Sequence, residues 1–264
     1  AKKGFTCTVY EQRAACGGLA SSEVFLEGFS TPGLLHDTAL FDPRIVKALQ
    51  LESHGLTYSG PTHRMLLRPN EAPLSLSENG GVSAWFKALK PVVTSLYQDA
   101  SPDLLGALKP GSLMTPGIAA LKAGRANVLE WTRLMPQCAE DTLAEWIDVP
   151  EERALWTLPS LFGTYMSPLS PSSTVTLALY WSQVGQQVKG GAQAIIDALL
   201  KASAANGVQL KTNTTVSNIL VENGQAVGVV TDQGEHRADR VFSTLGVAHT
   251  GLNLLAPGTL LGSV

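Results

Sequence analysis

A strand-like run from Phe5 to Tyr10 ends at Glu11, and Arg13, Gly17 and Gly18 follow closely. In a dinucleotide-binding βαβ unit, the acid at the end of the second strand hydrogen-bonds an adenosine ribose hydroxyl, about 20 residues after the Gly-rich turn that seats the pyrophosphate. Only ten residues precede Glu11, so we expect the first strand and its Gly-rich turn to be missing from this sequence. The chain is therefore predicted to enter a nucleotide-binding fold partway through.

The composition is that of a globular protein with few charges. Of the 264 residues, 44% are hydrophobic and 16% are charged, whereas a charged fraction of about 25% is usual. The mean hydropathy is +0.10. A large core or a missing covering segment explains these values, and so does an apolar ligand or a membrane surface. Peripheral membrane contact therefore stays open.

Several partners and sites find no support in the sequence. The net charge of −3, with no Lys/Arg-rich run, argues against a nucleic-acid partner. Cys7, Cys16 and Cys138 lack C-x-x-C spacing, and the five His residues lack paired ligand spacing, so no metal site is predicted. The odd cysteine number suits a reducing compartment, and no apolar run reaches the ~18 residues of a membrane span. We expect a cytoplasmic protein.

The chain is predicted to form two domains, one of them discontinuous. Residues 1–76 and 186–264 are interpreted as one α/β domain, and residues 77–185 as a mainly helical substrate domain. In the latter, apolar residues recur at spacings of three and four between Pro and Gly breaks. Its Trp residues either fill the core or line a ligand cavity, and core packing is the favoured interpretation because aromatic side chains in helices usually fill interiors.

Local signals mark individual elements. Asp42-Pro43 predicts the start of a short helix, and Leu66 to Leu76 a hairpin. Gly190-Gly191 opens a helix that ends at Asn206-Gly207, although a phosphate contact is the alternative role for this Gly pair. The Asn223-Gly224 turn predicts the first hairpin of an antiparallel meander.

Two further strands are expected from composition. The run Thr174 to Tyr180 is rich in β-branched residues, which favour strands. A last strand is expected around Val241-Phe242, after a second turn at Gln233-Gly234.

At this point the sequence resembles a known family. Glu11, Arg13 and the run Gly17 to Ser22 resemble the segment that follows the second strand in FAD-dependent oxidoreductases of the phytoene desaturase and amine oxidase group. The stretches Gly190 to Leu199 and Asn213 to Val229 resemble the same family's second FAD-contacting stretch. The likeness is greatest to the phytoene-dehydrogenase-like branch, which includes the pyridine nucleotide-disulfide oxidoreductase domain-containing 2 proteins.

The resemblance implies an α/β fold with an incomplete Rossmann-like, glutathione-reductase-like FAD-binding domain. The family's opening Gly-rich turn and its closing Gly-containing segment have no counterpart in this sequence. Most backbone donors to the pyrophosphate would come from those segments. We therefore expect FAD as the cofactor, with its retention by this chain alone in question.

The resemblance also implies roles for five residues. Glu11 accepts hydrogen bonds from ribose hydroxyls, with a strand-end surface acid as the alternative. Arg13 supplies positive charge near the phosphates, and Gly17 and Gly18 let the backbone approach them without a Cβ. Val216 pairs its backbone N–H and C=O with the adenine edge, although strand packing explains this residue equally well.

The implied activity is FAD-dependent oxidation or desaturation of an apolar small molecule, an isoprenoid or a lipid. The flavin carries the hydride chemistry in such enzymes, so the sequence assigns no catalytic residue. His36 and Asp37 form an acid–base pair or a polar loop near the cofactor. A hydrolase is rejected because the chain has no G-x-S-x-G elbow. The alternatives are a cofactor-free binding or assembly module, or one piece of a split flavoprotein that a second chain completes.

Overall fold

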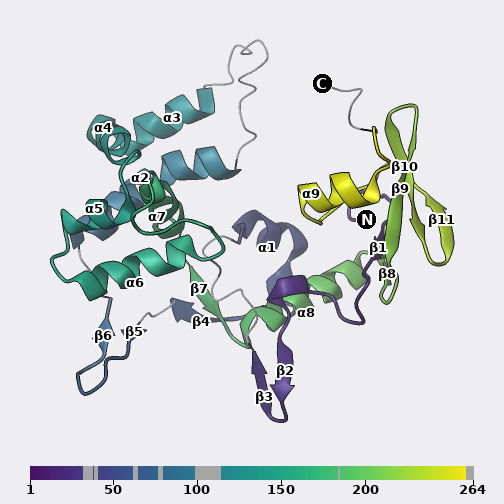
Figure 1. The fold of residues 1–264 in the computed structure, drawn as a ribbon, viewed down its shortest axis with the longest axis horizontal. Helices are drawn as coiled ribbons and strands as arrows, with labels where there is room; N and C mark the ends of the chain where they lie inside the picture. The colour runs from purple at the N-terminus through teal and green to yellow at the C-terminus, as the bar shows by residue number, and fades with distance from the viewer. Residues whose placement is uncertain are drawn as a thin grey trace. The chain divides into compact units, whose positions relative to one another are not determined.

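The computed structural model describes residues 1–31, 38, 41–61, 65–76, 80–98, 114–183 and 185–259 (Figure 1). It divides into two compact units. The first unit comprises Ala1–Leu35, Leu49–Leu56 and Ala192–Val264, and the second comprises His36–Ala48 and Thr57–Gly191.

This division differs from the expected one in the assignment of residues 36–48, 57–76 and 186–191, which group with the helical segments. Strand pairing explains the second of these ranges. β4 (Tyr58–Pro61) pairs antiparallel with β7 (Gln186–Val188), and Lys189 N donates to Thr57 O at 2.9 Å. A short hairpin of β5 (Met65–Leu66) and β6 (Leu74–Ser75) follows, at the position predicted from sequence.

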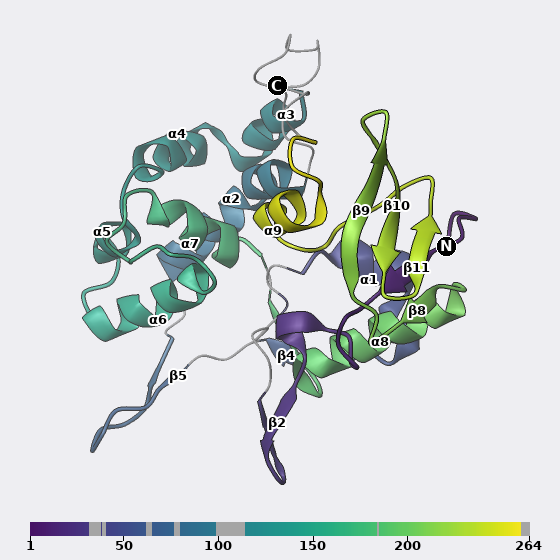
Figure 2. The same ribbon diagram turned by 45° about the vertical axis from the view of Figure 1, so that its right-hand side comes forward.

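The first unit combines one parallel strand pair, a short antiparallel hairpin and a separate three-stranded antiparallel sheet. β1 (Thr8–Tyr10) pairs in parallel with β8 (Gln209–Lys211), so that Tyr10 lies opposite Lys211. The antiparallel sheet has the order β11-β10-β9 (Figure 2). Its strands are β9 (Val216–Glu222), β10 (Gln225–Thr231) and β11 (Gly234–Arg237). The remaining elements are η1 (Gly18–Ala20), β2 (Glu23–Leu26), β3 (Phe29–Thr31), η2 (Leu51–His54), α8 (Gly191–Ala205), α9 (Val247–His249) and η3 (Thr250–Leu254).

Helix α8 follows directly from its sequence. Its buried face consists of small and branched apolar residues at helical spacing: Ala192, Ile195, Ile196, Ala198 and Ala202. Gly190 and Gly191 form the turn that begins the helix, with φ of 89° and 69°. Gly207 follows the helix with φ of 72°, the left-handed conformation of a C-terminal cap.

The antiparallel meander is also encoded locally. Asn223 and Gly224 have φ of 50° and 75°, as a two-residue type I′ hairpin turn requires. Gly228 in β10 is needed for a different reason, because a Cβ there would lie 2.3 Å from the carbonyl oxygen of His236 in β11. The expected strand at Val241-Phe242 is wrong: this segment has no strand assignment, and Phe242 is exposed.

The second unit is built mainly from helices. They are α1 (Pro43–Leu49, whose last residue groups with the first unit), α2 (Gly80–Gln98), α3 (Met114–Ala123), α4 (Arg125–Leu134), α5 (Ala139–Ala144), α6 (Pro150–Leu161) and α7 (Ser173–Trp181). Asp42 Oδ1 accepts a hydrogen bond from Arg44 N at 2.8 Å, which caps α1 as the Asp-Pro pair predicts.

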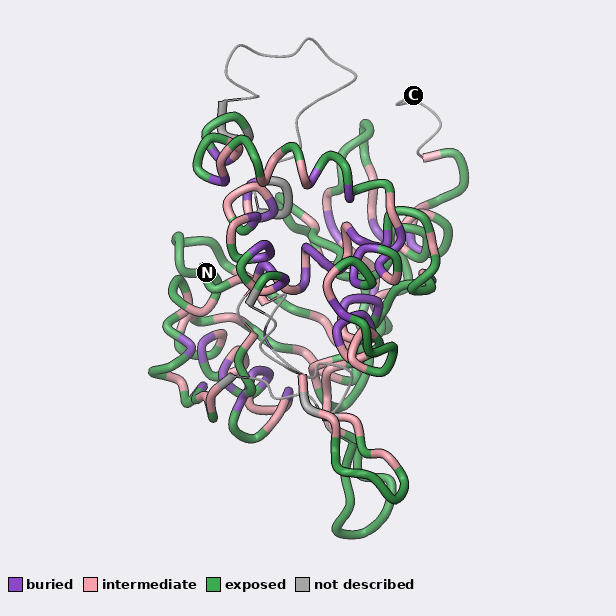
Figure 3. The backbone as a smooth tube through the Cα atoms, turned by 90° about the vertical axis from the view of Figure 1, so that its left-hand side faces the viewer, coloured by how far each residue is buried: buried purple, intermediate pink, exposed green. Residues whose placement is uncertain are grey.

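Aromatic side chains fill the helical core. Figure 3 marks the backbone of buried residues in purple. Trp85, Trp131 and Trp156 belong to this buried cluster, together with Phe86 and Leu177. The ring centroids of Trp85 and Trp131 lie 6.4 Å apart, and those of Phe86 and Trp156 6.0 Å apart, within the range of favourable aromatic pairs. These Trp residues are therefore core residues, which confirms the favoured interpretation of the sequence.

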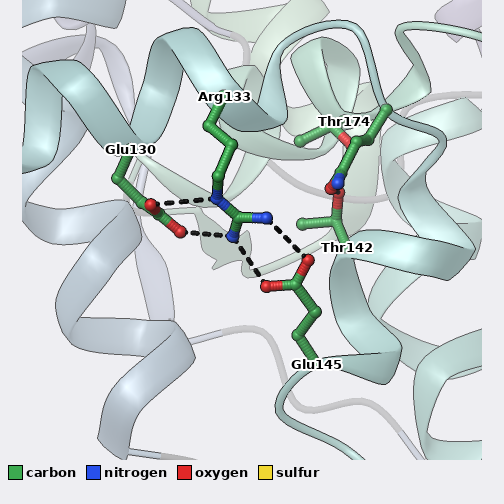
Figure 4. A network of polar contacts seen from close by, with 6 residues as sticks. Glu130, Arg133, Thr142, Glu145 and Thr174 are labelled. Atoms are coloured by element: carbon green, nitrogen blue, oxygen red, sulfur yellow. Dashed lines mark hydrogen bonds and ion pairs between the residues drawn. The ribbon is translucent and has the colours of Figure 1, made fainter.

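The run Thr174 to Tyr180 is helical, as part of α7, and its prediction as a strand is wrong. Burial of Leu177 and Ala178 against the aromatic cluster outweighs the strand preference of the β-branched residues. A hydrogen bond between two hydroxyls also stabilises the packing of α7 on α5, with Thr174 Oγ1 2.6 Å from Thr142 Oγ1 (Figure 4).

An ion-pair network joins α4 to the end of α5. The Arg133 guanidinium binds Glu130 through Nε and Nη2, and Glu145 through Nη1 and Nη2 at 2.9 and 2.6 Å (Figure 4). Hydrogen bonds from the Arg133 side chain lower the pKa of the Glu145 carboxyl. Within the described ranges, no helix is sufficiently long and apolar to traverse a lipid bilayer.

We expect Glu145→Gln to destabilise the second unit at neutral pH and to have no effect in acid. The pKa of Glu145 is lower in the folded than in the unfolded chain, so its contribution is present at neutral pH and is lost as the pH falls through the folded-state pKa. Urea unfolding followed by Trp fluorescence measures this, because all five Trp residues lie in the second unit. An equal loss at both pH values, or an equal loss in the control Glu235→Gln, contradicts the prediction.

Candidate functional site

Backbone hydrogen bonds bring the segment after β1 against the segment before β9. Glu11 N donates to Lys211 O at 2.9 Å, which continues the β1–β8 pairing by one residue. Thr214 N then donates to Glu11 O at 2.9 Å, and Asn213 N to Arg13 O at 3.1 Å. Since Val216 follows Thr214 by two residues, the structure places Glu11 and Arg13 beside the start of β9.

The Glu11 carboxylate is held by a local turn. Its Oε1 accepts a hydrogen bond from Arg13 N at 2.8 Å, and the residue is partly exposed. Among the described residues, no hydrogen-bond donor is recorded for Oε2. Arg13 is exposed, and its Nη1 donates to the carbonyl oxygen of Gly18 at 3.5 Å. A carboxylate oxygen and a guanidinium are thus both available to a ligand.

Gly17 and Gly18 take positive φ of 125° and 54°. A Cβ on Gly17 would lie 2.4 Å from Cδ1 of Ile196, so glycine at this position allows the loop to pack on α8. A Cβ on Gly18 would meet no atom within 4 Å. The structural reason for Gly17 is therefore contact with α8, and its predicted contact with a phosphate stays a prediction.

The loop also offers hydrogen-bond donors. Within the described part of the chain, the N–H groups of Gly17 and Gly18 have no recorded acceptor. Ser21 Oγ donates to Gly18 O at 2.7 Å, and Ser22 N donates to Gln193 Oε1 of α8 at 3.2 Å, so the far end of the loop is anchored to the helix. Successive free amides at a glycine turn form a concavity that binds anions.

A contact chain that the sequence did not indicate joins the two halves of the site. The Tyr10 ring lies 5.2 Å from the ring of His236 in β11, measured between centroids. His236 Nε2 forms a 3.0 Å hydrogen bond with Thr231 Oγ1, in which either atom can donate. Thr231 is the register partner of Val216. Tyr10, which precedes Glu11, is thus connected to Val216 at the start of β9. The connection runs through the side chains of His236 and Thr231.

The sequence contains no short signal for this chain of contacts. It depends on the register of β10 with β11, and on the meander lying against β1. Lys211 adds a cation 5.8 Å from the centroid of the Tyr10 ring, which is within the range of a cation–π contact.

Val216 lies on an edge strand. In the order β11-β10-β9, strand β9 has a partner on one side only among the described strands. An edge strand presents backbone N–H and C=O groups that another group can pair with. This arrangement suits the predicted pairing with an adenine edge without testing it.

The described residues identify neither a catalytic thiol nor a metal centre. Burial raises the pKa of the Cys16 thiol, and the nearby Glu11 carboxylate raises it further, so the group stays protonated at neutral pH. No group of three or more His, Cys, Asp or Glu in the described ranges could hold a metal ion. His36 and Asp37 lie outside the described residues.

Comparison with known proteins identifies the family. Residues 101–262 match the family described as flavin containing amine oxidoreductase. The chain belongs to this family. It is 27% identical over 281 aligned residues to pyridine nucleotide-disulfide oxidoreductase domain-containing protein 2 of Rattus norvegicus, covering 90% of this chain and 48% of the relative. It is 36% identical over 137 residues to a 4,4'-diapophytoene desaturase of Methylomonas sp, covering 51% of this chain and 26% of the relative.

Solved structures agree with the family assignment at the level of fold. An oxidoreductase from Methanosarcina mazei superimposes with a TM-score of 0.56 at 21% identity, over 96% of this chain and 56% of that one. A putrescine oxidase redesigned in its cofactor binding gives a TM-score of 0.54 at 15% identity, over 97% and 56%. The chain spans about half the length of the curated relatives it matches.

These findings confirm the predicted flavin oxidoreductase group and a fold that mixes helices and sheets. The Rossmann-like detail stays a prediction, since the described part of the chain contains a single parallel strand pair. The cofactor-binding roles of Glu11, Arg13, Gly17, Gly18 and Val216 also stay predictions.

We expect Gly17→Ala to destabilise the first unit by about 1–3 kcal/mol, because it adds both backbone strain and a collision with Ile196. Gly18→Ala is the matched control, since its Cβ meets open space and only the strain remains. The double variant Gly17→Ala/Ile196→Val lacks the colliding Cδ1, so it should recover part of the stability that Gly17→Ala loses. Thermal unfolding followed by far-UV circular dichroism measures all four proteins. Equal losses for the two Gly variants would contradict the packing role of Gly17.

We expect His236→Ala to loosen the start of β9 from Glu11. An aromatic pair contributes about 0.5–1.5 kcal/mol, so amide exchange at Asn213 and Thr214 should become several-fold faster. Hydrogen–deuterium exchange measured by NMR provides the test. Glu235→Ala, one residue earlier in β11 and exposed, should leave these amides unchanged. Unchanged exchange in His236→Ala would show that the ring contact does not hold the two segments together.

Proposed function

We propose that this chain forms the adenosine-binding part of an FAD site in an oxidoreductase that dehydrogenates or desaturates an apolar substrate. The observation that carries the proposal is the pair of backbone hydrogen bonds joining residues 11 and 13 to residues 213 and 214. They place an available carboxylate oxygen, an exposed guanidinium and an edge strand in one region of the first unit. This set of groups suits a ribose, a phosphate and an adenine.

The residues present fit the cofactor in chemical type. The Glu11 carboxylate would accept hydrogen bonds from the ribose hydroxyls, and charge-assisted bonds of this kind are about twice as strong as neutral ones. The N–H groups of Gly17 and Gly18, together with Arg13, would face the phosphates. Backbone groups of Val216 would pair with the adenine edge. None of these residues would take part in bond breaking.

FAD, when bound, supplies the acceptor for a hydride from a substrate C–H bond. The part of this chain is to bind and orient the nucleotide end of the cofactor. The turn through which Arg13 N holds Glu11 Oε1 fixes the carboxylate before the cofactor arrives, so less freedom is lost on binding.

An apolar substrate is supported by two observations. One relative is named as a desaturase that forms 4,4'-diapolycopene. The chain itself has 16% charged residues and a slightly positive mean hydropathy. We include isoprenoids and lipids in the proposed substrate class on this basis.

A second candidate is a split flavoprotein, in which another chain completes the FAD site. It is favoured by exposed apolar side chains in the last part of the first unit, where Phe242, Val247 and Leu252 are each more than 80% exposed. Apolar surface of this kind is usually covered by a partner. A protein that co-purifies with the chain and restores its flavin absorbance would support this candidate.

We expect the purified chain to bind FAD, seen as quenching of flavin fluorescence on titration, and Glu11→Ala to weaken the affinity about 10- to 100-fold. Glu11→Gln keeps an oxygen for Arg13 N and removes the charge, so it should fall between wild type and Glu11→Ala. Glu27→Ala, an exposed acid in the turn between β2 and β3, is the matched control. Unchanged affinity in Glu11→Ala would remove this residue from the proposed site, and no FAD binding by the wild type would rule out an autonomous site.

A further inference from the structure

An open pocket of about 500 Å³ lies between α2 and α3 of the second unit. Its volume falls within the range of about 300–1,000 Å³ that small-molecule sites occupy. Pro91 lines the pocket within α2 and has no N–H to continue the helical hydrogen bonding. Neither the family match nor the proposed FAD site assigns a role to this pocket.

Three lysines line the pocket. Lys87 and Lys90 come from α2, three residues apart and therefore neighbours on one side of the helix, and Lys122 comes from the end of α3. Within the described residues, none of the three has an ion-pair partner, and no Asp or Glu is among the lining residues. Three like charges around one cavity repel one another, so an anion placed among them would be stabilised.

Two hydroxyl groups of the wall have no partner among the described residues. Thr94 Oγ1 and Ser95 Oγ are shielded from solvent, and neither forms a hydrogen bond within that part of the chain. Both residues line the pocket, and Ser95 is 8% exposed. A buried polar atom without a partner is rare in native proteins and requires an explanation, such as a ligand that supplies the missing hydrogen bond.

The rest of the wall is apolar. Ile118 and Ala119 of α3 and Pro91 of α2 line it, and lysine side chains carry methylene stems that can cover apolar surface. An inorganic anion would leave this apolar surface without contact. A neutral hydrocarbon would leave the lysine charges and the two hydroxyls unpaired.

We propose that this pocket binds an amphiphile with an anionic head group, either a carboxylate or a phosphate ester, and an apolar chain. The head group lies among Lys87, Lys90 and Lys122. The hydroxyls of Thr94 and Ser95, which are shielded in the free protein, rotate toward it and donate hydrogen bonds. The chain lies against Ile118 and Ala119. This inference goes beyond the proposed FAD site, because it concerns the second unit and its test requires no flavin.

The test is calorimetric titration of the purified 264-residue chain with dodecanoate, dodecyl phosphate and 1-dodecanol, each below its aggregation concentration. Both anionic probes should bind more tightly than dodecanol, and their affinity should fall as the salt concentration rises, because salt screens exposed charges. The tighter of the two anions identifies the head group that the pocket prefers. Equal affinity for dodecanol and for both anions would overturn the proposal.

Substitutions locate the binding. Changing all three lysines to Gln should weaken the anionic probes about tenfold, because each exposed ion pair contributes modestly. The same three positions changed to Arg should retain most of the affinity. Lys189→Gln, an exposed lysine of the same unit outside the pocket, is the matched control. Retained affinity in the triple Gln variant would overturn the proposal.

The hydroxyl contact has a separate signature. Ser95→Ala removes a buried group that has no partner in the free protein, so it should leave the stability unchanged or raise it. The affinity for the anionic probes should nevertheless fall. A merely structural role for Ser95 predicts the reverse, with lower stability and unchanged affinity.

Discussion

The candidate FAD site depends on the backbone pairing of two segments that lie about two hundred residues apart in the sequence. β1 and β8 run parallel, and the pairing continues beyond Tyr10 through the bonds of Glu11 and Arg13 to residues 211–214. Parallel strands end at the same edge, so the chain delivers Glu11 and the start of β9 to one place. Side-chain contacts such as that between Tyr10 and His236 add to the contact between these segments, but the backbone pairing determines where the segments lie.

The loop that follows Glu11 shows how packing and ligand chemistry share the same residues. Gly17 has to lack a side chain because Ile196 of α8 fills that space. In the described part of the chain, the resulting backbone conformation leaves the consecutive N–H groups of Gly17 and Gly18 without acceptors, which is a property of anion sites. A glycine selected for helix packing can therefore prepare a binding surface at the same time. For this reason, a Gly-Gly pair in a sequence does not by itself distinguish a packing role from a phosphate contact.

Sequence reasoning succeeded where the decisive information is local. The Gly190-Gly191 start of α8, its closing Gly207 and the Asn223-Gly224 turn are each specified by a few consecutive residues, and the structure has them as predicted. It failed where burial in the folded protein determines the secondary structure. The run Thr174 to Tyr180 has the composition of a strand, yet it is a helix because the aromatic core buries one of its faces. At Val241-Phe242 the expected strand is absent from the described structure, which provides no partner for it.

The candidate site likewise contains residues that local sequence indicates and contacts that only the tertiary structure determines. Glu11, Arg13 and the Gly pair were recognisable from spacing and resemblance, whereas the contacts from Tyr10 through His236 to Thr231 were not. They require the register between strands, which no short motif encodes. The lysine pocket is a similar case, because Lys87 and Lys122 belong to different helices and are brought to one cavity only by their packing.

The charged groups of the two sites bear on how flavin binding has to be interpreted. FAD carries two phosphates and is itself an anion with an extended apolar ring system. The three lysines that line the pocket of the second unit would therefore attract it to some extent. Weak, salt-sensitive binding of FAD to this chain would not by itself identify the site in the first unit. A carboxylate repels phosphate and gains only from hydroxyl donors, so dependence of the affinity on the Glu11 charge is evidence for a ribose contact that attraction by lysines cannot reproduce.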